Sequence, residues 1–493
     1  MNRREFLRSV GAGALAAVVP KRILAADRRR PNVVLFFIDD MGWKDTGYGG
    51  SDFYETPNID RLATEGVVFT SAYAAAGNCA PSRACLISGQ YTPRHGVYAV
   101  NSTKRGAVNR MRLVPIPNRT DLAPENVTVA EAMKAAGYAT AMFGKWHLGK
   151  SGPTLPKSQG FDVDLSFNPP SGAQFKKTND PKGIYKIAEA ACRFMENNRD
   201  RPFLAYLSHH ATHMAIQARK EMHEKFAAKK AGELHRHAGF AAMNAQMDDG
   251  VGVVLRKLKD LGLEKDTLVI FTSDNGGLPQ SSQAPLRGFK GVYYEGGIRV
   301  PMIARWPGVV EPGSKCDVPV HNVDLYPTCL AAAGAAAPAG KQLDGESLLP
   351  LLKGGRRLKR EAIFWHFPGY LDRANSGSRD RQFRTRPVSV IRKGDWKLHL
   401  FHEEWALDGG REKIDTNNAV ELYDLAGDVG ERKDLAARQT DKRNELLDDL
   451  LAWLKKSDAP LPTQANPSYD PTAPADTKKR GGRRKRKKQK PPK

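Results

Sequence analysis

Four short clusters of polar residues each follow an apolar run with the length of a buried strand. Ligands of open α/β sheets bind in the crevice beyond the carboxyl ends of the strands, so we expect the four clusters to form one site. The clusters are Asp39 and Asp40 after residues 33–38, Lys145 and His147 after residues 139–143, His209, His210 and His213 after residues 203–208, and Asp274 and Asn275 after residues 267–272.

The side chains of these clusters are chemically complementary. Carboxylate and amide oxygens are hard ligands that suit Ca²⁺ or Mg²⁺, and no Cys/His set with zinc spacing accompanies them. Basic residues supply positive charge and proton donors, and a divalent cation beside them indicates a site for sulfate or phosphate. The oxygen ligands are Asp39, Asp40, Asp274 and Asn275, and the basic residues are Arg83, Lys145, His147, His213 and Lys290.

Each feature has a simpler interpretation when it is seen alone. Adjacent aspartates after a strand usually form a turn or a helix cap, and histidines in loops are mostly surface residues. The five cysteines are an odd number, so at least one stays unpaired in an exported protein. Cys79 is the candidate for a special thiol, although a lone cysteine is most often a buried free thiol.

Residues 79–89 carry the most specific pattern in the chain, Cys-Ala-Pro-Ser-Arg-Ala-Cys-Leu-Ile-Ser-Gly. This stretch resembles the signature of the sulfatase family, in which a cysteine followed at fixed spacing by proline and arginine is oxidised to formylglycine. Residues 144–149, 272–276, 286–301 and 421–425 resemble further family segments in the expected order. Two departures are Ser88, where threonine is usual, and Thr212, where proline usually precedes the histidine. His209 and His210 therefore stay alternatives to His213.

The resemblance implies a catalytic role for each cluster. Asp39, Asp40, Asp274, Asn275 and position 79 would hold one Ca²⁺, with Mg²⁺ as the less favoured ion. One hydroxyl of the hydrated formylglycine at Cys79 would attack sulfur, held by Asp274 and Arg83. Lys145, Lys290 and the cation would neutralise charge on the sulfate oxygens, and His213 would protonate the departing alcohol. His147 would help the second hydroxyl to expel sulfate.

The alternation of apolar runs with amphipathic stretches predicts an α/β fold. With the resemblance, the expectation is an alkaline-phosphatase-like large mixed sheet with helices on both faces, plus a smaller C-terminal α+β domain. The expected strands are 33–38, 139–143, 203–208, 267–272, 300–304, 362–367, 388–392 and 396–401, and the expected helices are 56–65, 128–136, 184–197, 235–261, 324–333 and one that ends near residue 453. The expected units are a catalytic domain over 27–355, the small domain over 356–457 and a disordered basic tail over 458–493.

The formal net charge of +23 lies mostly in the two ends of the chain. Residues 1–30 carry +6 and residues 476–493 carry +10, which leaves a mildly basic body and argues against a nucleic-acid-binding fold. Arg3 and Arg4 before a short apolar stretch predict a twin-arginine signal peptide over residues 1–26. We therefore expect export to the periplasm or beyond, with the twin-arginine machinery and the formylglycine-generating enzyme as partners and no transmembrane segment.

The expected activity is the hydrolysis of sulfate esters, with a sulfated carbohydrate as the favoured substrate. One alternative is a phosphomonoester or phosphonate hydrolase of the same superfamily, which would normally use serine or threonine as its nucleophile. The other is a non-catalytic protein that binds sulfated glycans. An arginine-rich loop over residues 373–386 could contact further sulfates, or it could be a solvated loop.

Overall fold

A computed structural model describes residues 30–169 and 179–473 of the chain. The predicted signal peptide over residues 1–26 and the basic run over residues 476–493 lie outside these ranges. Within the described ranges, no helix combines the length and apolar character needed to cross a bilayer.

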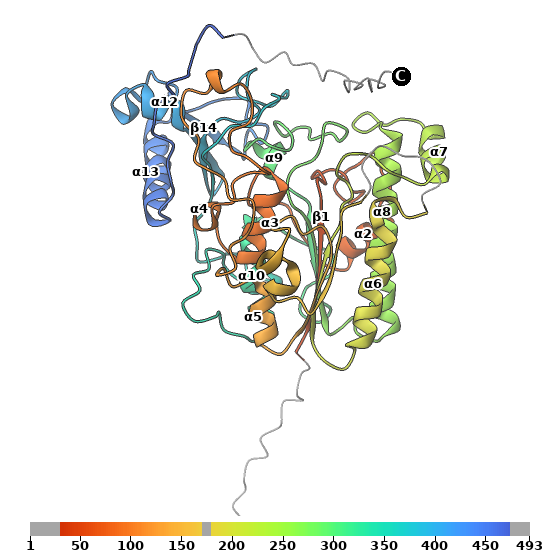
Figure 1. The fold of residues 1–493 in the computed structure, drawn as a ribbon. Coiled ribbons are helices and arrows are strands. Elements are labelled where there is room, and N and C mark those ends of the chain that lie inside the picture. Colours follow the sequence, from red (N-terminus) through yellow and green to blue (C-terminus); the bar gives the residue numbers. More distant parts are fainter. Residues whose placement is uncertain (1–29, 170–178, 474–493) are drawn as a thin grey trace, which may run out of the picture.

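An eight-stranded mixed sheet forms the centre of the molecule (Figure 1). From β5 to β7 the neighbouring strands run parallel, whereas β8 runs antiparallel to both of its neighbours. The order across the sheet is β5 (Val163–Ser166), β4 (Ala139–Gly144), β6 (Phe203–Ser208), β1 (Asn32–Ile38), β7 (Thr267–Ser273), β8 (Met302–Arg305), β2 (Val67–Phe69) and β9 (Ser314–Cys316).

Helices cover both faces of this sheet, as Figure 1 shows. One face carries α2 (Pro57–Thr64), α6 (Ile184–Asn197), α7 (Lys220–Ala228) and α8 (Ala238–Asp260). The other carries α3 (Cys79–Ser88), α5 (Val129–Ala135) and α10 (Leu325–Ala333). The shorter helices are α4 (Thr92–His95), α9 (Glu295–Ile298), α11 (Leu349–Leu352) and α12 (His402–Leu407), and β3 (Ala72–Tyr73) pairs with β10 (Val320–His321).

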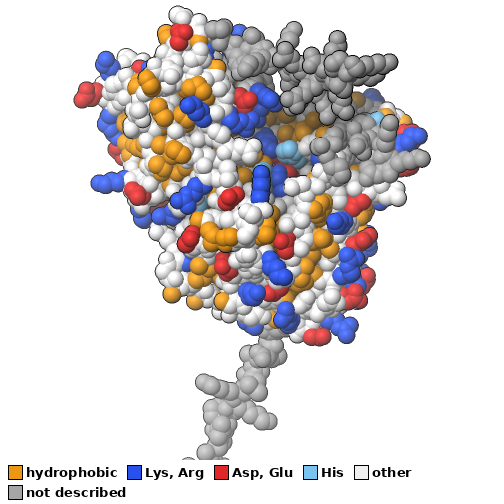
Figure 2. Space-filling model, viewed as in Figure 1, with side chains coloured by type: hydrophobic (Ala, Val, Ile, Leu, Met, Phe, Trp, Pro, Cys, Tyr) orange, Lys and Arg blue, Asp and Glu red, His pale blue; other side chains and the backbone are white. Residues whose placement is uncertain are grey.

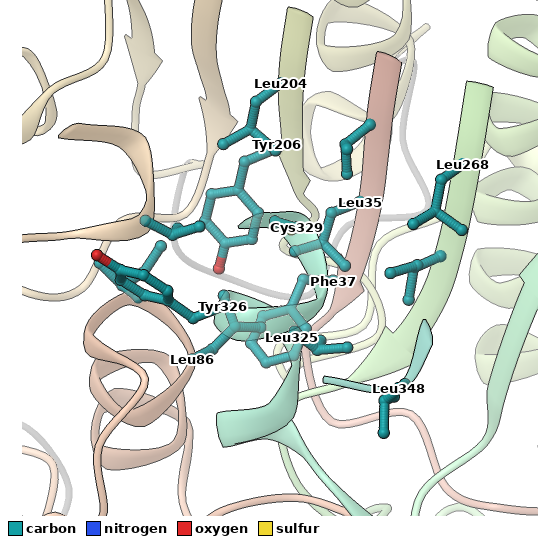
Figure 3. Packing of buried hydrophobic residues seen from close by; sticks show 14 of the residues in the cluster. Leu35, Phe37, Leu86, Leu204, Tyr206, Leu268, Leu325, Tyr326, Cys329 and Leu348 are labelled. Atoms are coloured by element: carbon teal, nitrogen blue, oxygen red, sulfur yellow. The ribbon is translucent and has the colours of Figure 1, made fainter. Parts of the chain in front are cut away.

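Strand β1 is buried along its whole length because its two faces pack into two different cores. Leu35 and Phe37 join the cluster that contains α3 and α10, where they lie near Leu86 and Leu325 (Figure 3). The alternate residues of β1 pack against α6 and α8. Alternation of side chains across a strand explains why β1 reads as a continuous apolar run.

A smaller antiparallel sheet follows, with the order β11 (Ala362–Phe367), β12 (Val388–Lys393), β13 (Trp396–Phe401) and β14 (Val420–Asp424). Helix α13 (Thr440–Lys456) packs on one face, where Leu446 and Leu450 meet Leu398 and Leu400. Residues of the opposite face, including Trp365, pack against the larger body. The predicted fold class, a large mixed sheet with helices on both faces plus a smaller α+β part, is confirmed.

The prediction of a disordered tail that starts at residue 458 is wrong for residues 458–473. The Pro460 carbonyl lies 3.2 Å from Nε2 of His366. The Val114 amide donates to the Gln464 carbonyl at 2.9 Å. These backbone groups find partners on the folded body, so the high proline content gives an extended strap here rather than disorder.

A buried chain of hydrogen bonds joins this strap to the small sheet. Nδ1 of His366 lies 2.7 Å from Oγ of Ser389, which in turn lies 2.8 Å from Nε2 of His402. Burial lowers the pKa of His366 to about 4 and that of His402 to about 3. Both imidazoles therefore stay neutral in the folded protein at pH values where an unfolded chain would protonate them.

We expect the free energy of unfolding to fall as the pH drops from about 7 to about 4. The unfolded chain binds protons near pH ~6.5 while the folded His366 and His402 do not, so each contributes a slope of up to about 1.4 kcal/mol per pH unit. His402→Gln should make this slope shallower in urea unfolding measured across that range. An unchanged slope in His402→Gln would contradict the assignment to the buried pair.

Candidate active site

Helix α3 brings Cys79 to the centre of the site. The helix begins at Cys79 after Asn78, which has extended backbone, and Pro81 lies in its first turn, where proline is tolerated. Cys79 is 2 % exposed. The amide groups of the first turn give this end of a helix a positive character, so it favours negative charge on the side chain of residue 79 or on a bound anion.

The two pairs of oxygen ligands lie side by side because β1 and β7 are neighbouring parallel strands. Ile38 and Ser273, the last residues of these strands, are partners in the sheet, so the residues that follow them meet at the same edge. The Asp40 amide donates to Oδ1 of Asp274 at 3.1 Å, and Nδ2 of Asn275 donates to Oδ1 of Asp40 at 2.8 Å.

Three oxygens in this group are buried without a hydrogen-bond donor among the described residues: Oδ1 of Asp39, Oδ2 of Asp40 and Oδ1 of Asn275. Asp39, Asp274 and Cys79 each present a ligand atom within 4.8 Å of the other two, and so do Asp39, Asp40 and His213. Buried oxygens without a partner are costly unless a cation binds them. The donor set therefore fits one oxygen-loving cation, as predicted from the sequence.

Three basic residues balance the carboxylates. Arg83 is fully buried, and its Nε and Nη2 donate to Oδ2 of Asp274 at 3.0 and 2.6 Å. Lys145 lies with its Nζ 2.5 Å from Oδ2 of Asp39. Nζ of Lys290 lies 2.5 Å from Oδ1 of Asp40 and 3.9 Å from Sγ of Cys79.

Close packing at the end of β4 directs Lys145 into the site. Gly144 has a φ of +100°, and a Cβ there would lie 2.1 Å from the carbonyl oxygen of Ser208. Only glycine allows this approach, which lets the Lys145 amide donate to that oxygen at 2.8 Å. Ser208 also accepts from Arg83 and donates to the Lys145 carbonyl at 2.6 Å, a role that sequence analysis missed because the residue looked only like the end of a strand.

The surrounding charges shift the ionisation of the site. Burial would raise the pKa of the Cys79 thiol, but Lys145 and Lys290 outweigh burial and lower it. Burial and the neighbouring Asp39 carboxylate raise the pKa of Asp274, against the effect of Arg83. Crowded carboxylates of this kind repel one another, and a bound cation relieves the repulsion.

The histidines of the site differ in their access to solvent. His147 has a left-handed backbone with φ of +66°, its Nδ1 is buried without a partner among the described residues, and burial lowers its pKa to about 3. The side chain of His213 is 39 % exposed, and its Nε2 lies 3.6 Å from Oδ2 of Asp40. His209 stacks on Phe36 in the core.

The third histidine of the loop, His210, lies inside the protein. His210 is buried, with Nε2 2.7 Å from the Phe167 carbonyl. Of the three candidates, His213 is the one that combines contact with the carboxylates and access to solvent, so the geometry favours the choice made from the sequence.

A cleft of about 600 Å³ leads into this site. Figure 2 shows histidine and basic side chains around a recess on the side to which the carboxyl ends of the strands point. Part of the arginine-rich loop is unavailable to a ligand, because Arg379 pairs with Glu404 and Glu421, and Arg386 pairs with Asp380 and Glu403. The cleft is lined by Lys145, His147, Ala80, Ala99, Asn101, Phe167 and neighbouring residues.

Comparison with known proteins identifies the family. The family model "Sulfatase" matches residues 31–335, and the model "N-sulphoglucosamine sulphohydrolase, C-terminal" matches residues 289–458. A "Sulfatase" of Formosa agariphila is 33 % identical over 88 % of this chain and 90 % of its own. Human "Arylsulfatase A" is 34 % identical, with 83 % of each chain covered. The chain belongs to the sulfatase family. It is a sulfuric ester hydrolase.

Solved structures agree with the family. The structure of Ps i-CgsB is similar at 27 % identity with a TM-score of 0.69, and the similarity covers 89 % of this sulfatase and 95 % of that chain. A phosphonate monoester hydrolase of Agrobacterium radiobacter shares the fold at 21 % identity with a TM-score of 0.64. The expected alkaline-phosphatase-like architecture is thereby confirmed.

Arg83→Ala should destabilise the sulfatase by about 3–5 kcal/mol, because it leaves Asp274 buried without its cationic partner. Urea unfolding measures the change. Arg61→Ala, which removes an exposed arginine paired with Glu65, should change stability by about 1 kcal/mol or less. Equal stability of Arg83→Ala and the unsubstituted protein would mean that the buried ion pair contributes nothing to the fold.

Proposed function

We propose that this sulfatase hydrolyses sulfate esters of carbohydrates, with a formylglycine formed at Cys79 as its nucleophile and one Ca²⁺ as its cation. The observation that carries the proposal is the position of Cys79. Its sulfur lies at the first residue of α3, beside Lys290 and within 4.8 Å of ligand oxygens of Asp39 and Asp274. A thiolate is a poor ligand for a hard cation, whereas a hydroxyl of a hydrated aldehyde suits one.

The residues proposed to hold the cation are Asp39, Asp40, Asp274 and Asn275, and three of them keep an oxygen without a donor among the described residues: Asp39, Asp40 and Asn275. Calcium accepts this all-oxygen set in flexible geometry, whereas Mg²⁺ demands a stricter octahedron. When bound, the ion would supply positive charge to a sulfate oxygen and to the hydroxyl at position 79. Asp39 and Asp40 each have one carboxylate oxygen paired with a lysine and the other without a donor among the described residues. The cation and the lysines can therefore act on the same bound anion.

The proposed nucleophile also provides a way to release the bound sulfate. The hydrated aldehyde offers one hydroxyl that attacks sulfur and a second that, on losing its proton, expels sulfate and restores the aldehyde. Arg83 fixes Asp274 beside position 79, and Asp274 would hold the attacking hydroxyl. His147 has a buried Nδ1 without a partner among the described residues, and we assign it as the acceptor of the proton of the second hydroxyl.

The leaving alcohol needs a proton as the bond from sulfur to oxygen breaks. His213 lies at the exposed rim of the site, where the remainder of a large substrate would extend, and we assign it as the proton donor. Lys145 pairs with Asp39 and Lys290 with Asp40, and both lysines would stabilise charge that develops on the sulfate oxygens. These lysines also distinguish the site from a two-metal phosphatase, since they take up carboxylate oxygens that a second ion would need.

A carbohydrate substrate is supported by relatives and by the size of the cleft. Ps i-CgsB has been solved in complex with k-i-k-neocarrahexaose. A curated mouse relative, 33 % identical, is named N-acetylgalactosamine-6-sulfatase. A cleft of about 600 Å³ is within the range of small-molecule sites and holds more than a sulfate group. Export through the twin-arginine machinery stays a prediction from residues 1–26.

The mass of the tryptic peptide that contains position 79 tests the nucleophile. Protein co-expressed with the formylglycine-generating enzyme should carry an aldehyde or its hydrate there, and Cys79→Ala should lose at least about 10³-fold in kcat/KM on an aryl sulfate. Cys85→Ala on the same helix is the matched control and should keep both the modification and most activity. An unmodified thiol in an active enzyme would refute the proposal.

Removal of the metal tests the cation. Chelation should abolish activity and lower the melting temperature, and Ca²⁺ at about 100 times its Kd should restore about 2.7 kcal/mol of stability. Asp40→Asn should lose most of this calcium-dependent stabilisation, because it removes one ligand charge. Activity and stability restored fully by Mg²⁺ and not by Ca²⁺ would contradict the assignment of the ion.

A further inference from the structure

Lys182 is a buried lysine at the edge of the site that the mechanism above does not use. It precedes α6 in a turn where its backbone is left-handed, with φ of +60°, and its amide donates to Oε1 of Gln217 at 3.2 Å. The residue is 5 % exposed. No motif marked it in the sequence, because a single lysine between a proline and a glycine is an ordinary turn.

Lys182 differs from the other basic residues of the site because no carboxylate of the described residues pairs with its ammonium group. Arg83, Lys145 and Lys290 each have a carboxylate oxygen within 2.6 Å. Lys182, in contrast, has no acidic side chain within 4.0 Å among residues 30–169 and 179–473. Its electrostatic neighbours are Asp39, Asp40 and Lys145. Burial lowers the pKa of Lys182 to about 8, so the ammonium form still predominates near neutral pH. An ammonium on a largely buried side chain that has no acidic partner is costly unless an anion binds it.

The position of Lys182 indicates where such an anion would come from. Its neighbour Gly183 approaches Phe167 so closely that a Cβ on Gly183 would lie 2.3 Å from the aromatic ring. Phe167 lines the same cleft as Lys145 and His147. The turn that carries Lys182 therefore packs on a side chain that lines the cleft, and Lys145 and Lys290 are already proposed to hold the scissile sulfate.

We propose that Lys182 binds a second anionic group of the substrate, a sulfate or a carboxylate on the same sugar or on its neighbour. The inference rests on the proposed function, since it takes the first sulfate to lie against position 79. An ammonium is a compact point charge that accepts either anion without a fixed geometry. Lys182 would thus make the sulfatase selective for doubly charged carbohydrate over singly charged esters.

Steady-state kinetics with matched substrates tests this assignment. The set is para-nitrophenyl sulfate, a hexosamine with one sulfate, the same sugar with a second sulfate, and the same sugar linked to a uronic acid. Lys182→Asn removes the charge and tolerates the left-handed backbone, and Lys182→Met keeps the length of the side chain. Lys186→Met on α6, whose ammonium lies over the Phe167 ring, is the matched control.

Both Lys182 variants should lower kcat/KM about 10- to 100-fold for the doubly charged substrates and less than about threefold for the singly charged ones. The two doubly charged sugars show whether sulfate or carboxylate is the preferred anion. An equal loss on all substrates would place Lys182 at the scissile sulfate, and no loss on any would make it structural. Either result overturns the inference, whereas failure of the proposed function itself would appear as no hydrolysis by the unsubstituted enzyme.

Discussion

Mutual repulsion among Asp39, Asp40 and Asp274, buried together at the ends of two neighbouring strands, is the constraint on which the rest of the site depends. Three carboxylates cannot remain ionised in one buried pocket unless positive charge surrounds them. Arg83 supplies it from α3, Lys145 from the end of β4 and Lys290 from the loop that precedes α9. The oxygens still without donors are those proposed to bind a cation, so the arrangement that stabilises the carboxylates also supports the proposed site for an anion.

The smaller sheet contributes to this arrangement although none of its strands carries a proposed catalytic residue. Lys397 on β13 is fully buried and lies 2.9 Å from Oε1 of both Glu295 and Glu431. Glu295 begins α9, shortly after Lys290 in the chain. On the same side, the indole of Trp365 donates to the Ala74 carbonyl at 2.8 Å, shortly before Cys79. The small sheet thus holds two segments that carry proposed site residues, one through a buried ion network and one through a hydrogen bond.

Much of the fold was predictable because its main strands are buried on both faces and therefore read as continuous apolar runs. β6, β11 and β13 have the predicted bounds, and β1, β4 and β7 differ by a residue at an end. The short strands β2, β3, β9 and β10 were not predicted, since two or three residues carry no periodicity and depend on their neighbours for pairing. Residues 458–473 were assigned to a tail from composition alone, which cannot register that their backbone groups bind the folded body.

The sequence by itself was enough to predict which residues the structure brings together in the candidate site. The Cys-x-Pro-x-Arg pattern at residues 79–83, together with acidic and basic clusters at predicted strand ends, was enough to name its residues, because the carboxyl ends of parallel strands share one edge. Only the tertiary structure decided which of three histidines reaches the carboxylates, that Ser208 links Arg83 to Lys145, and that Arg379 and Arg386 are neutralised by glutamates. It also showed that the turn of Lys182 packs on Phe167, a residue of the cleft. These outcomes depend on burial and on contacts between distant segments, and neither is encoded in local residue spacing.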